Sequence, residues 1–402
     1  MALSPSGLVV KAQSVFLCLG IFYAIIIALM ATPPVQRVVF YAHKFRWPLY
    51  PNFDLPEAYG LAPGKTLNLH LQTPDNITLG AWFIVSDSYH QAHRLSSALT
   101  PEALSLDVVS KAVRKYPTIL FLHGTGGTRV NPSRLQFYKH ATARLQANIF
   151  TIDYRGFGDS TGIPTEQGLE TDAYTAWKWI LEQGTKEEDV LVVGHSLGTN
   201  IATKLGKRLA HEGAKPRGIA LLAPFSELGV LLETYKILRI PILQPIMGFP
   251  LGRKLVKALT LERYDTLSDI QALNVPVFLA HSTDDPEITH MHSRTLMDHL
   301  MIPYLPQVTQ LPIGPGAPLT PAEFDTYKES LRKRKEARAL LVQKAEVPNF
   351  GIVEEFETKN GKVVYVETMW GGHNVVGLQE GVQDEMAKLF RLAVPRWDTT
   401  VA

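Results

Sequence analysis

The sequence predicts an α/β fold: a mostly parallel, eight-stranded sheet flanked by helices, with a cap insertion and an N-terminal transmembrane helix. Two observations lead to this prediction. From Thr118 onward, apolar runs of strand length alternate with segments of helical periodicity, which is the pattern of a sheet covered on both faces. Before that, a long uncharged segment near the N-terminus has the composition of a membrane span. With 402 residues, the chain can bury a large core.

The N-terminal anchor is the segment Val15 to Ala31, 17 residues without a charge, after a tail of residues 1–14. It is longer than the apolar core of a usual signal peptide and lacks a good cleavage pattern, so we expect an uncleaved span. Residues 32–65 form a juxtamembrane segment, in which Pro33 and Pro34 are expected to end the helix. Six aromatic and basic side chains there predict an interfacial belt: Arg37, Tyr41, Lys44, Arg46, Trp47 and Tyr50. The alternative is that this stretch packs on the domain.

Two features predict opposite orientations in the membrane. Lys11 is the one basic side chain before the span, whereas three follow it closely, so the positive-inside rule leaves most of the chain in the cytosol. The tripeptide Asn76-Ile77-Thr78 is an N-glycosylation sequon, and such a sequon is used only on the lumenal side.

Residues 66–395 are expected to form a single α/β domain. It opens with Thr66–Gln72 and Leu79–Ser86, two alternating runs around a turn, which predict an antiparallel strand pair. Asn360-Gly361, between two later alternating runs, predicts a hairpin. Five apolar runs predict the central strands: residues 118–123, 148–153, 190–194, 219–223 and 275–281. In sheets of this kind, functional sites form at the carboxyl ends of the strands.

A first insertion, at about residues 227–274, interrupts the alternation of strands and helices. It is apolar but contains Pro241, Pro245 and Pro250, so we do not expect a single regular helix. The segment is either a helical cap that completes the core or a lid that covers an acyl pocket or touches the bilayer. The two interpretations are compatible.

A second insertion, at about residues 302–347, contains the loop LPIGPGAPLT and then a helix. Thr320 and Glu323 supply a capping box, with Pro321 at the first helical position. The helix, expected over Glu323–Lys344, carries several basic residues: Lys328, Arg332, Lys333, Arg334, Lys335, Arg338 and Lys344. These side chains form either a solvated face or a contact for anionic lipid headgroups.

A candidate nucleophile, Ser196, lies in the run DVLVVGHSLGTN, between a predicted strand and a predicted helix. A serine on a sharp strand-to-helix turn needs neighbours with almost no side chain two residues away on each side, and Gly194 and Gly198 supply them. Such a serine also needs a base, an acid that orients the base, and donors for the oxyanion. In this architecture the order along the chain is Ser, Asp, His.

The acid and the base are expected in loops that follow strands. Asp285 is the expected acid, because Pro286 and the preceding His281 place it in the loop beyond the strand run 275–281; Asp284 is the alternative. His373, behind two glycines in YVETMWGGHNVVG, is the expected base. Three other late histidines are expected at the surface: His290, His292 and His299.

Two backbone N–H groups are expected to bind the oxyanion. One belongs to Leu197, the residue after the nucleophile, and the other to Thr125 in the glycine-rich run FLHGTGGTR. Arg155 and Asp159, in DYRGFGDSTG, are expected to brace the loops around the site. Nucleophile, acid, base and oxyanion loop occur in the order that predicts an α/β-hydrolase.

Composition and motifs exclude several other classes. The formal charge is only +2, which does not indicate a nucleic-acid partner. No phosphate-binding glycine motif precedes a helix, which argues against a nucleotide. The single cysteine, Cys18, lies inside the predicted span as an apolar filler or a palmitoylation site. A disulfide framework, a cysteine-based metal site and a cysteine nucleophile are therefore excluded, and we expect neither a metal nor an organic cofactor.

Several motifs together resemble one family. HGTGGTR, TIDYRGFGDSTGIPTEQG, GHSLGTNIATKL, LAPFSEL and HSTDDP, with the N-terminal span, look like the membrane-anchored serine hydrolases of the α/β-hydrolase-domain-twelve group. The resemblance covers about Leu79 to Leu300. It implies a nucleophile at Ser196, an acid at Asp285 and a base at His373. It also implies action on monoacylglycerols and lysophospholipids, notably lysophosphatidylserine, and a catalytic domain on the lumenal side of the endoplasmic reticulum.

We therefore expect a membrane-anchored hydrolase of carboxylic esters whose substrate is a lipid. The same nucleophile would also serve an acyltransferase, a thioesterase or a peptidase, because the three catalytic groups do not select the acyl acceptor. A third hypothesis is a catalytically silent scaffold that binds lipid or a partner through the basic helix.

Overall fold

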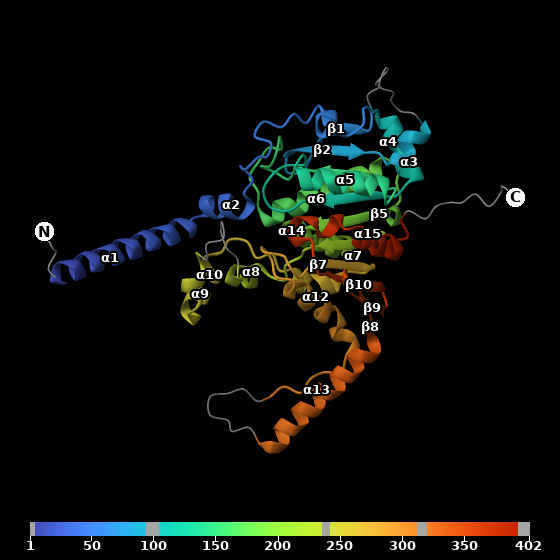
Figure 1. Ribbon diagram of the computed structural model, residues 1–402. Helices are drawn as coiled ribbons and strands as arrows, with labels where there is room; N and C mark the ends of the chain where they lie inside the picture. Colours follow the sequence, from blue (N-terminus) through green and yellow to red (C-terminus); the bar gives the residue numbers. More distant parts are fainter. Residues whose placement is uncertain (1–4, 94–103, 235–241, 312–319, 393–402) are drawn as a thin grey trace.

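The computed structural model describes residues 5–93, 104–234, 242–311 and 320–392 (Figure 1). Parts of the predicted segments lie outside these described residues. They are residues 1–4 of the N-terminal tail, 235–241 of the first insertion with Pro241, 312–319 of the Pro/Gly loop, and 393–395 at the end of the domain.

The described strands form one mixed sheet in the order β1-β2-β4-β3-β5-β6-β7-β10-β9-β8. Their bounds are β1 Thr66–Gln72, β2 Thr78–Ile84, β3 Thr118–Leu122, β4 Asn148–Ile152, β5 Val190–His195, β6 Gly218–Leu222, β7 Val277–Ser282, β8 Gln343–Val347, β9 Gly351–Thr358 and β10 Gly361–Thr368. Six neighbouring strands, in the spatial order β4-β3-β5-β6-β7-β10, pair in parallel. The strand pairs at both edges of the sheet are antiparallel. The predicted α/β fold and its central strands are confirmed. The described sheet has ten strands rather than the predicted eight, and one of the added strands is β8, in which the second insertion ends and which pairs with β9.

Helices cover both faces of this sheet (Figure 1). Their bounds are α1 Pro5–Met30, α2 Pro33–Tyr41, α3 Asp87–His93, α4 Leu106–Lys115, α5 Pro132–Ala143, α6 Glu166–Glu182, α7 Leu197–His211, α8 Leu228–Thr234, α9 Gln244–Met247, α10 Pro250–Leu259, α11 Thr266–Asp269, α12 Met291–Met301, α13 Pro321–Leu341, α14 Gly372–Val375 and α15 Glu380–Phe390. Alternate residues of each central strand point to opposite faces. One core cluster therefore joins the strands to α4, α6, α7 and α12, and the other joins them to α5 and α15.

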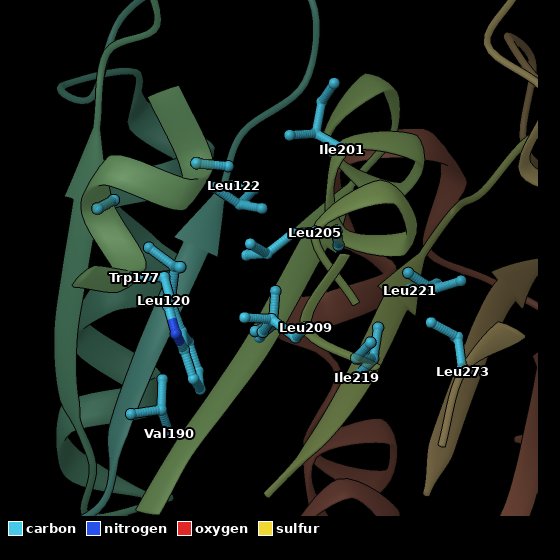
Figure 2. Packing of buried hydrophobic residues seen from close by; sticks show 14 of the residues in the cluster. Leu120, Leu122, Trp177, Val190, Ile201, Leu205, Leu209, Ile219, Leu221 and Leu273 are labelled. Atoms are coloured by element: carbon cyan, nitrogen blue, oxygen red, sulfur yellow. The ribbon is translucent and has the colours of Figure 1, made fainter. Parts of the chain in front are cut away.

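Strand β3 illustrates how the alternation builds both cores. Leu120 and Leu122 belong to the first cluster, and Ile119 and Phe121 to the second. Figure 2 shows Leu120 beside Trp177 of α6, and Leu205 and Leu209 of α7 over the neighbouring strands. Truncating a buried leucine of this kind to alanine typically costs about 2–5 kcal/mol. This packing fixes the strand ends that carry the site.

Both predicted hairpins are present. Gln72 pairs with Thr78 at the end of the β1–β2 ladder. In the β9–β10 hairpin, Gly361 already pairs with Thr358, so the turn residues are Lys359 and Asn360, one position before the predicted pair. Gly361 has a positive φ of 109° and packs so closely on Pro276 that a side chain would collide there. The glycine is therefore needed in the strand rather than in the turn.

The N-terminal helix α1 extends away from the domain (Figure 1), and its residues Val9–Met30 are long and apolar enough to cross a membrane. Helix α1 ends at Met30, just before Pro33 and Pro34, as predicted. The two prolines then begin α2, because proline is tolerated in the first turn of a helix. Tyr41 is wrongly predicted as part of an interfacial belt. It is fully buried, and its hydroxyl lies 2.6 Å from that of Tyr264.

The first insertion consists of short helices, α8 to α11, rather than one regular helix, as predicted. Pro245 and Pro250 lie in the first turns of α9 and α10. In the second insertion the predicted capping box of Thr320 and Glu323 is present. The helix it begins, α13, ends at Leu341, so Lys344 belongs to β8 and not to the basic helix.

Strand β8 forms one edge of the described sheet. All five of its residues are exposed, and Lys344 pairs with Glu346 at 2.8 Å. Helix α13, which precedes β8, projects away from the body of the domain (Figure 1).

Candidate active site

Ser196 lies on a sharp turn between β5, which ends at His195, and α7, which begins at Leu197. Its backbone has φ 53° and ψ −121°, a conformation that costs a residue with a side chain about 1–3 kcal/mol. A Cβ on Gly194 would collide with the carbonyl of Gly198, and one on Gly198 with the carbonyl of Leu122. The two glycines are therefore required for the strand to turn into the helix at this point.

His373 lies at the start of α14, after Gly371 and Gly372, both of which have positive φ. Its Nε2 is 2.9 Å from Oγ of Ser196, although the two residues are 177 positions apart in the chain. The glycine pair lets the chain turn sharply after β10 and direct the imidazole toward the nucleophile. The structure brings the predicted base to the predicted nucleophile.

Asp285 follows β7, and its Oδ2 accepts a hydrogen bond of 2.8 Å from Nδ1 of His373. Its Oδ1 accepts the backbone N–H groups of Glu287 and Ile288, which hold the carboxylate in place. Asp284, the alternative acid, instead accepts the N–H of Gly372 and is exposed. Because Nδ1 donates to Asp285, Nε2 of a neutral His373 can accept the Ser196 hydroxyl proton.

A second buried histidine holds Asp285. Nε2 of His281 lies 3.1 Å from Oδ2 of Asp285 and 2.9 Å from the carbonyl of Ile288. Because both partners accept, Nε2 donates, and Nδ1 of His281 can accept from Ser293 Oγ at 2.7 Å. Sequence reasoning used His281 only to place Asp285. The feature of the sequence that could have indicated this role is a histidine within a strand whose preceding residues are apolar and buried.

The charges of the site favour an ionised acid and a basic imidazole. Burial would raise the pKa of Asp285, but hydrogen bonds from His281 and His373 lower that pKa well below its usual range. Burial would lower the pKa of His373, but its hydrogen bond to Asp285 and the charges of Asp285 and Glu287 raise that pKa overall. Burial lowers the pKa of His195 to about 3, so this ring is neutral and its Nε2 donates to the carbonyl of His373 at 2.8 Å.

Both residues that are predicted to supply oxyanion donors line the cavity that contains Ser196. Leu197 opens α7, so its N–H has no acceptor within the helix. Thr125 lines the same cavity as Ser196. Its loop is held from outside: the N–H of Gly126 donates to the carbonyl of Tyr41 at 2.9 Å, and the N–H of Gly127 to that of Phe45 at 3.0 Å. The segment after α1 thus holds the glycine-rich loop that contains Thr125.

The residues predicted to brace the site are in ion pairs. Arg155 binds Asp172 at 2.8 Å and Asp75 at 2.7 Å, and Asp159 binds Arg129 at 2.6 Å. Their predicted structural role is confirmed.

His292 is wrongly predicted at the surface. It is buried, and its Nδ1 lies 2.8 Å from Oγ of Ser226. Helix α12 has one buried face, and His292 lies on this face together with Leu296 and Leu300. His290 and His299 are partly exposed.

A cavity of about 230 Å³ opens onto these groups. It is bounded by Thr125, Ser196, Leu197 and His373 of the site, by residues of the α1–α2 segment and the first insertion, and by residues of the loops that follow β6 and β7. Most of these other residues are apolar: Ile27, Met30, Ala31, Val39, Phe40, Phe225, Leu228, Leu231, Leu232, Ile242, Leu243, Val256, Leu259 and Leu261. The polar ones include Gln36, Arg37, Glu262 and Glu287. Within the described ranges, no group of three or more His, Cys, Asp or Glu residues lies together as a metal site.

Known proteins resemble the chain in sequence and in fold. A profile described as the α/β hydrolase fold matches residues 117–235. The chain is 29% identical over 283 residues to lysophosphatidylserine lipase ABHD12 of Danio rerio, covering 70% of each protein. It is 30% identical over 267 residues to protein ABHD12B of Homo sapiens, covering 66% of this chain and 69% of that protein. An α/β hydrolase from Vibrio vulnificus shares the fold, with a TM-score of 0.50 and 14% identity over 88% of this chain and 89% of that one.

The sequence match to ABHD12B covers more than two thirds of that protein. Together with the sheet and its strand-to-helix turn, it shows that the chain belongs to the ABHD12 family of α/β hydrolases and is a serine ester hydrolase.

Proposed function

We propose that this protein is a membrane-anchored lipase that cleaves the carboxylic ester of single-chain lipids. Ser196 is the nucleophile, His373 the base and Asp285 the acid that orients His373. One observation carries the proposal: the hydrogen-bonded chain from Asp285 through His373 to Ser196 faces a largely apolar cavity that is also lined by the N-terminal helix α1.

The reaction follows from this geometry. Oγ of Ser196 attacks the acyl carbonyl carbon while Nε2 of His373 takes the hydroxyl proton. The N–H groups of Thr125 and Leu197 stabilise the oxyanion, and a preorganised donor of this kind is typically worth about 3–4 kcal/mol in the barrier. His373 then returns the proton to the departing alcohol. Water, deprotonated by His373, attacks the acyl-enzyme, and His373 then gives this proton to the leaving Oγ of Ser196 as the fatty acid is released.

The walls of the cavity support a long acyl chain as the bound group. Burying one methylene contributes about 0.8 kcal/mol, so an apolar cavity favours long acyl chains over short ones. The names of the ABHD12 relatives support lysophosphatidylserine in particular. Monoacylglycerols carry the same single chain and are the second substrate class of this proposal.

Arg37 favours an anionic headgroup over a neutral one. It lines the cavity, and its Nε is buried without a hydrogen bond within the described residues. An unsatisfied buried donor typically costs about 1–3 kcal/mol, and a phosphate or carboxylate of the substrate would satisfy it. We therefore rank lysophospholipids with an acidic headgroup above monoacylglycerols.

The proposal also includes a single-pass anchor, with the catalytic domain on the lumenal side of the endoplasmic reticulum. The sequon at Asn76 supports this side, because Asn76 is exposed in the turn between β1 and β2 and is accessible to glycosylation. A gel shift on glycosidase treatment, lost in Asn76→Gln, is the expected result. An unglycosylated domain cleaved by protease added outside intact microsomes would contradict the lumenal placement.

The decisive assay measures fatty-acid release from lysophospholipids, monoacylglycerols and short soluble esters by the detergent-solubilised full chain. Ser196→Ala should abolish release while still folding. Arg37→Gln should lower the rate on lysophosphatidylserine more than on monoacylglycerol, whereas Arg37→Lys should retain part of the difference. Release that persists in Ser196→Ala would overturn the proposed chemistry. Serine-dependent release from short esters alone would overturn the proposed substrate.

A further inference from the structure

We propose that the membrane helix α1 is also a wall of the acyl-binding pocket, so that the anchor itself takes part in selecting the length of the substrate's acyl chain. This inference rests on the proposed function, because it concerns the chain of the lipid whose ester Ser196 cleaves. Its occupant is an acyl chain that enters from the bilayer.

The cavity itself carries the first part of the inference. Ile27, Met30 and Ala31 of the anchor line the same cavity as Ser196 and His373. From the cap, Ile242 and Val256 line it too. A chain bound at the nucleophile therefore lies between the cap and the membrane helix.

One stripe of α1 faces the domain. Its half-buried positions in this part are Tyr23, Ile26, Ile27 and Met30, which follow the i, i+3, i+4, i+7 spacing of one helix face. Ile25 and Leu29, on the other side, are 52% and 53% exposed. The helix therefore has a protein-facing stripe and a side left for lipid, as expected for a wall rather than a free tether.

Hydrogen bonds hold this wall against the cap. Within α1, Oη of Tyr23 donates to the carbonyl of Ile242 at 2.8 Å. In α2, Nε2 of Gln36 donates to the carbonyl of Leu259 at 2.8 Å, and Oε1 of Gln36 accepts the N–H of Leu261 at 3.0 Å. A tyrosine hydroxyl or an amide inside an apolar layer is costly without a partner, so these contacts favour one docked position of α1.

Helix α10, which also borders the cavity, is placed for contact with the bilayer. Val256 lines the cavity, whereas Leu251 and Leu255 are 79% and 52% exposed. The same helix carries the exposed basic residues Arg253 and Lys254. Exposed leucines with neighbouring basic side chains are typical of a helix that lies in the membrane interface. The cavity is thus bordered by two lipid-facing helices, and a bilayer lipid reaches it without crossing water.

Substitutions on the two sides of α1 test the wall. In the full chain in lipid nanodiscs, Ile27→Trp should fill part of the cavity. The kcat/KM for an oleoyl lysophospholipid, divided by the kcat/KM for an octanoyl one, should then fall by roughly tenfold. The reason is that each lost methylene contact changes the binding constant by about fourfold. The matched control is Ile25→Trp, the same change on the lipid side, which should leave the ratio unchanged. Equal ratios in both variants would overturn the inference.

A second measurement needs no substitution and no turnover. An alkyl fluorophosphonate with a diazirine at the end of its chain should label Ser196 and, after illumination, crosslink to the peptide that contains Ile27 and Met30. Crosslinks confined to the β-sheet domain would overturn the wall. Failure of the proposed function would show in a different measurement. The unsubstituted enzyme would then release no fatty acid from long-chain lipids in a Ser196-dependent way. The crosslink would still decide whether α1 lines the pocket.

Discussion

Oε2 of Glu287 lies 3.8 Å from Nε2 of His373, the ring nitrogen that also faces Ser196. Burial opposes a charged His373, but Asp285 and then Glu287 raise the pKa of its imidazole overall. In the proposed mechanism His373 accepts a proton only when it is neutral, so activity should rise as the pH increases through the pKa of His373.

Glu287→Gln should therefore move the acid limb of the kcat/KM profile to lower pH, because it removes a charge that raises the pKa of His373. Glu380→Gln, a change at an exposed glutamate of α15, is the matched control. The measurement is a pH–rate profile on one soluble ester. An acid limb that stays in place or moves to higher pH would contradict the electrostatic role of Glu287.

The two neighbouring aspartates should differ sharply in their effect on the rate. Asp285→Asn removes the acceptor that orients His373, and comparable changes lower kcat by about three to four orders of magnitude. Asp284→Asn alters only an exposed contact with the N–H of Gly372, and the rate should stay within a small factor. Single-turnover acylation by an activated ester measures both. Similar losses in the two variants would mean that Asp285 is not the orienting acid.

Gly198→Ala should abolish labelling of Ser196 by a fluorophosphonate. The new Cβ would collide with the carbonyl of Leu122, so α7 must shift away from β3 and carry Ser196 with it. Overpacking of this kind typically costs about 1–3 kcal/mol, and the melting temperature should fall as well. Gly229→Ala in α8, where the added Cβ approaches only the flexible end of Glu227, should keep both labelling and melting temperature.

Arg129→Met should destabilise the whole domain. Its guanidinium is fully buried between Asp153 at 2.5 Å and Asp159 at 2.6 Å, and its loss leaves Asp153 as a buried charge without its partner. Breaking a buried pair typically costs about 3–5 kcal/mol. Arg332→Met, on the exposed face of α13, removes ion pairs in solvent and should not change the free energy of unfolding. Denaturant titration of both variants in detergent distinguishes buried from surface pairing.

Short-range patterns could be predicted well from the sequence. The capping box at Thr320 and the glycines around Ser196 act through neighbours in the chain, so their geometry follows from local chemistry. The loops that hold Asp285 and His373 could be found because parallel strands end at one edge of the sheet.

Contacts between distant segments could not be predicted in the same way. Tyr41 is an aromatic residue close behind the span, as membrane-interface residues are, but contacts with the distant Phe157 and Tyr264 place it in the core. Lys344 continues the basic run of α13 in the sequence, but pairing with β9 places it in a strand. The stripe of α1 that faces the cap is invisible in the sequence, because apolar residues occupy both sides of that helix.

The polar edge strand β8 has a consequence for neighbouring copies of the protein. Anchored chains diffuse in two dimensions and meet each other often, and an open strand edge offers its N–H and C=O groups to the same edge of another copy. In β8 every residue is exposed, and Lys344 and Glu346 stand along the strand as a charged pair. Pairing with a second sheet would strip these charged side chains of water, which opposes it. The outermost strand therefore protects a crowded membrane surface from edge-to-edge aggregation.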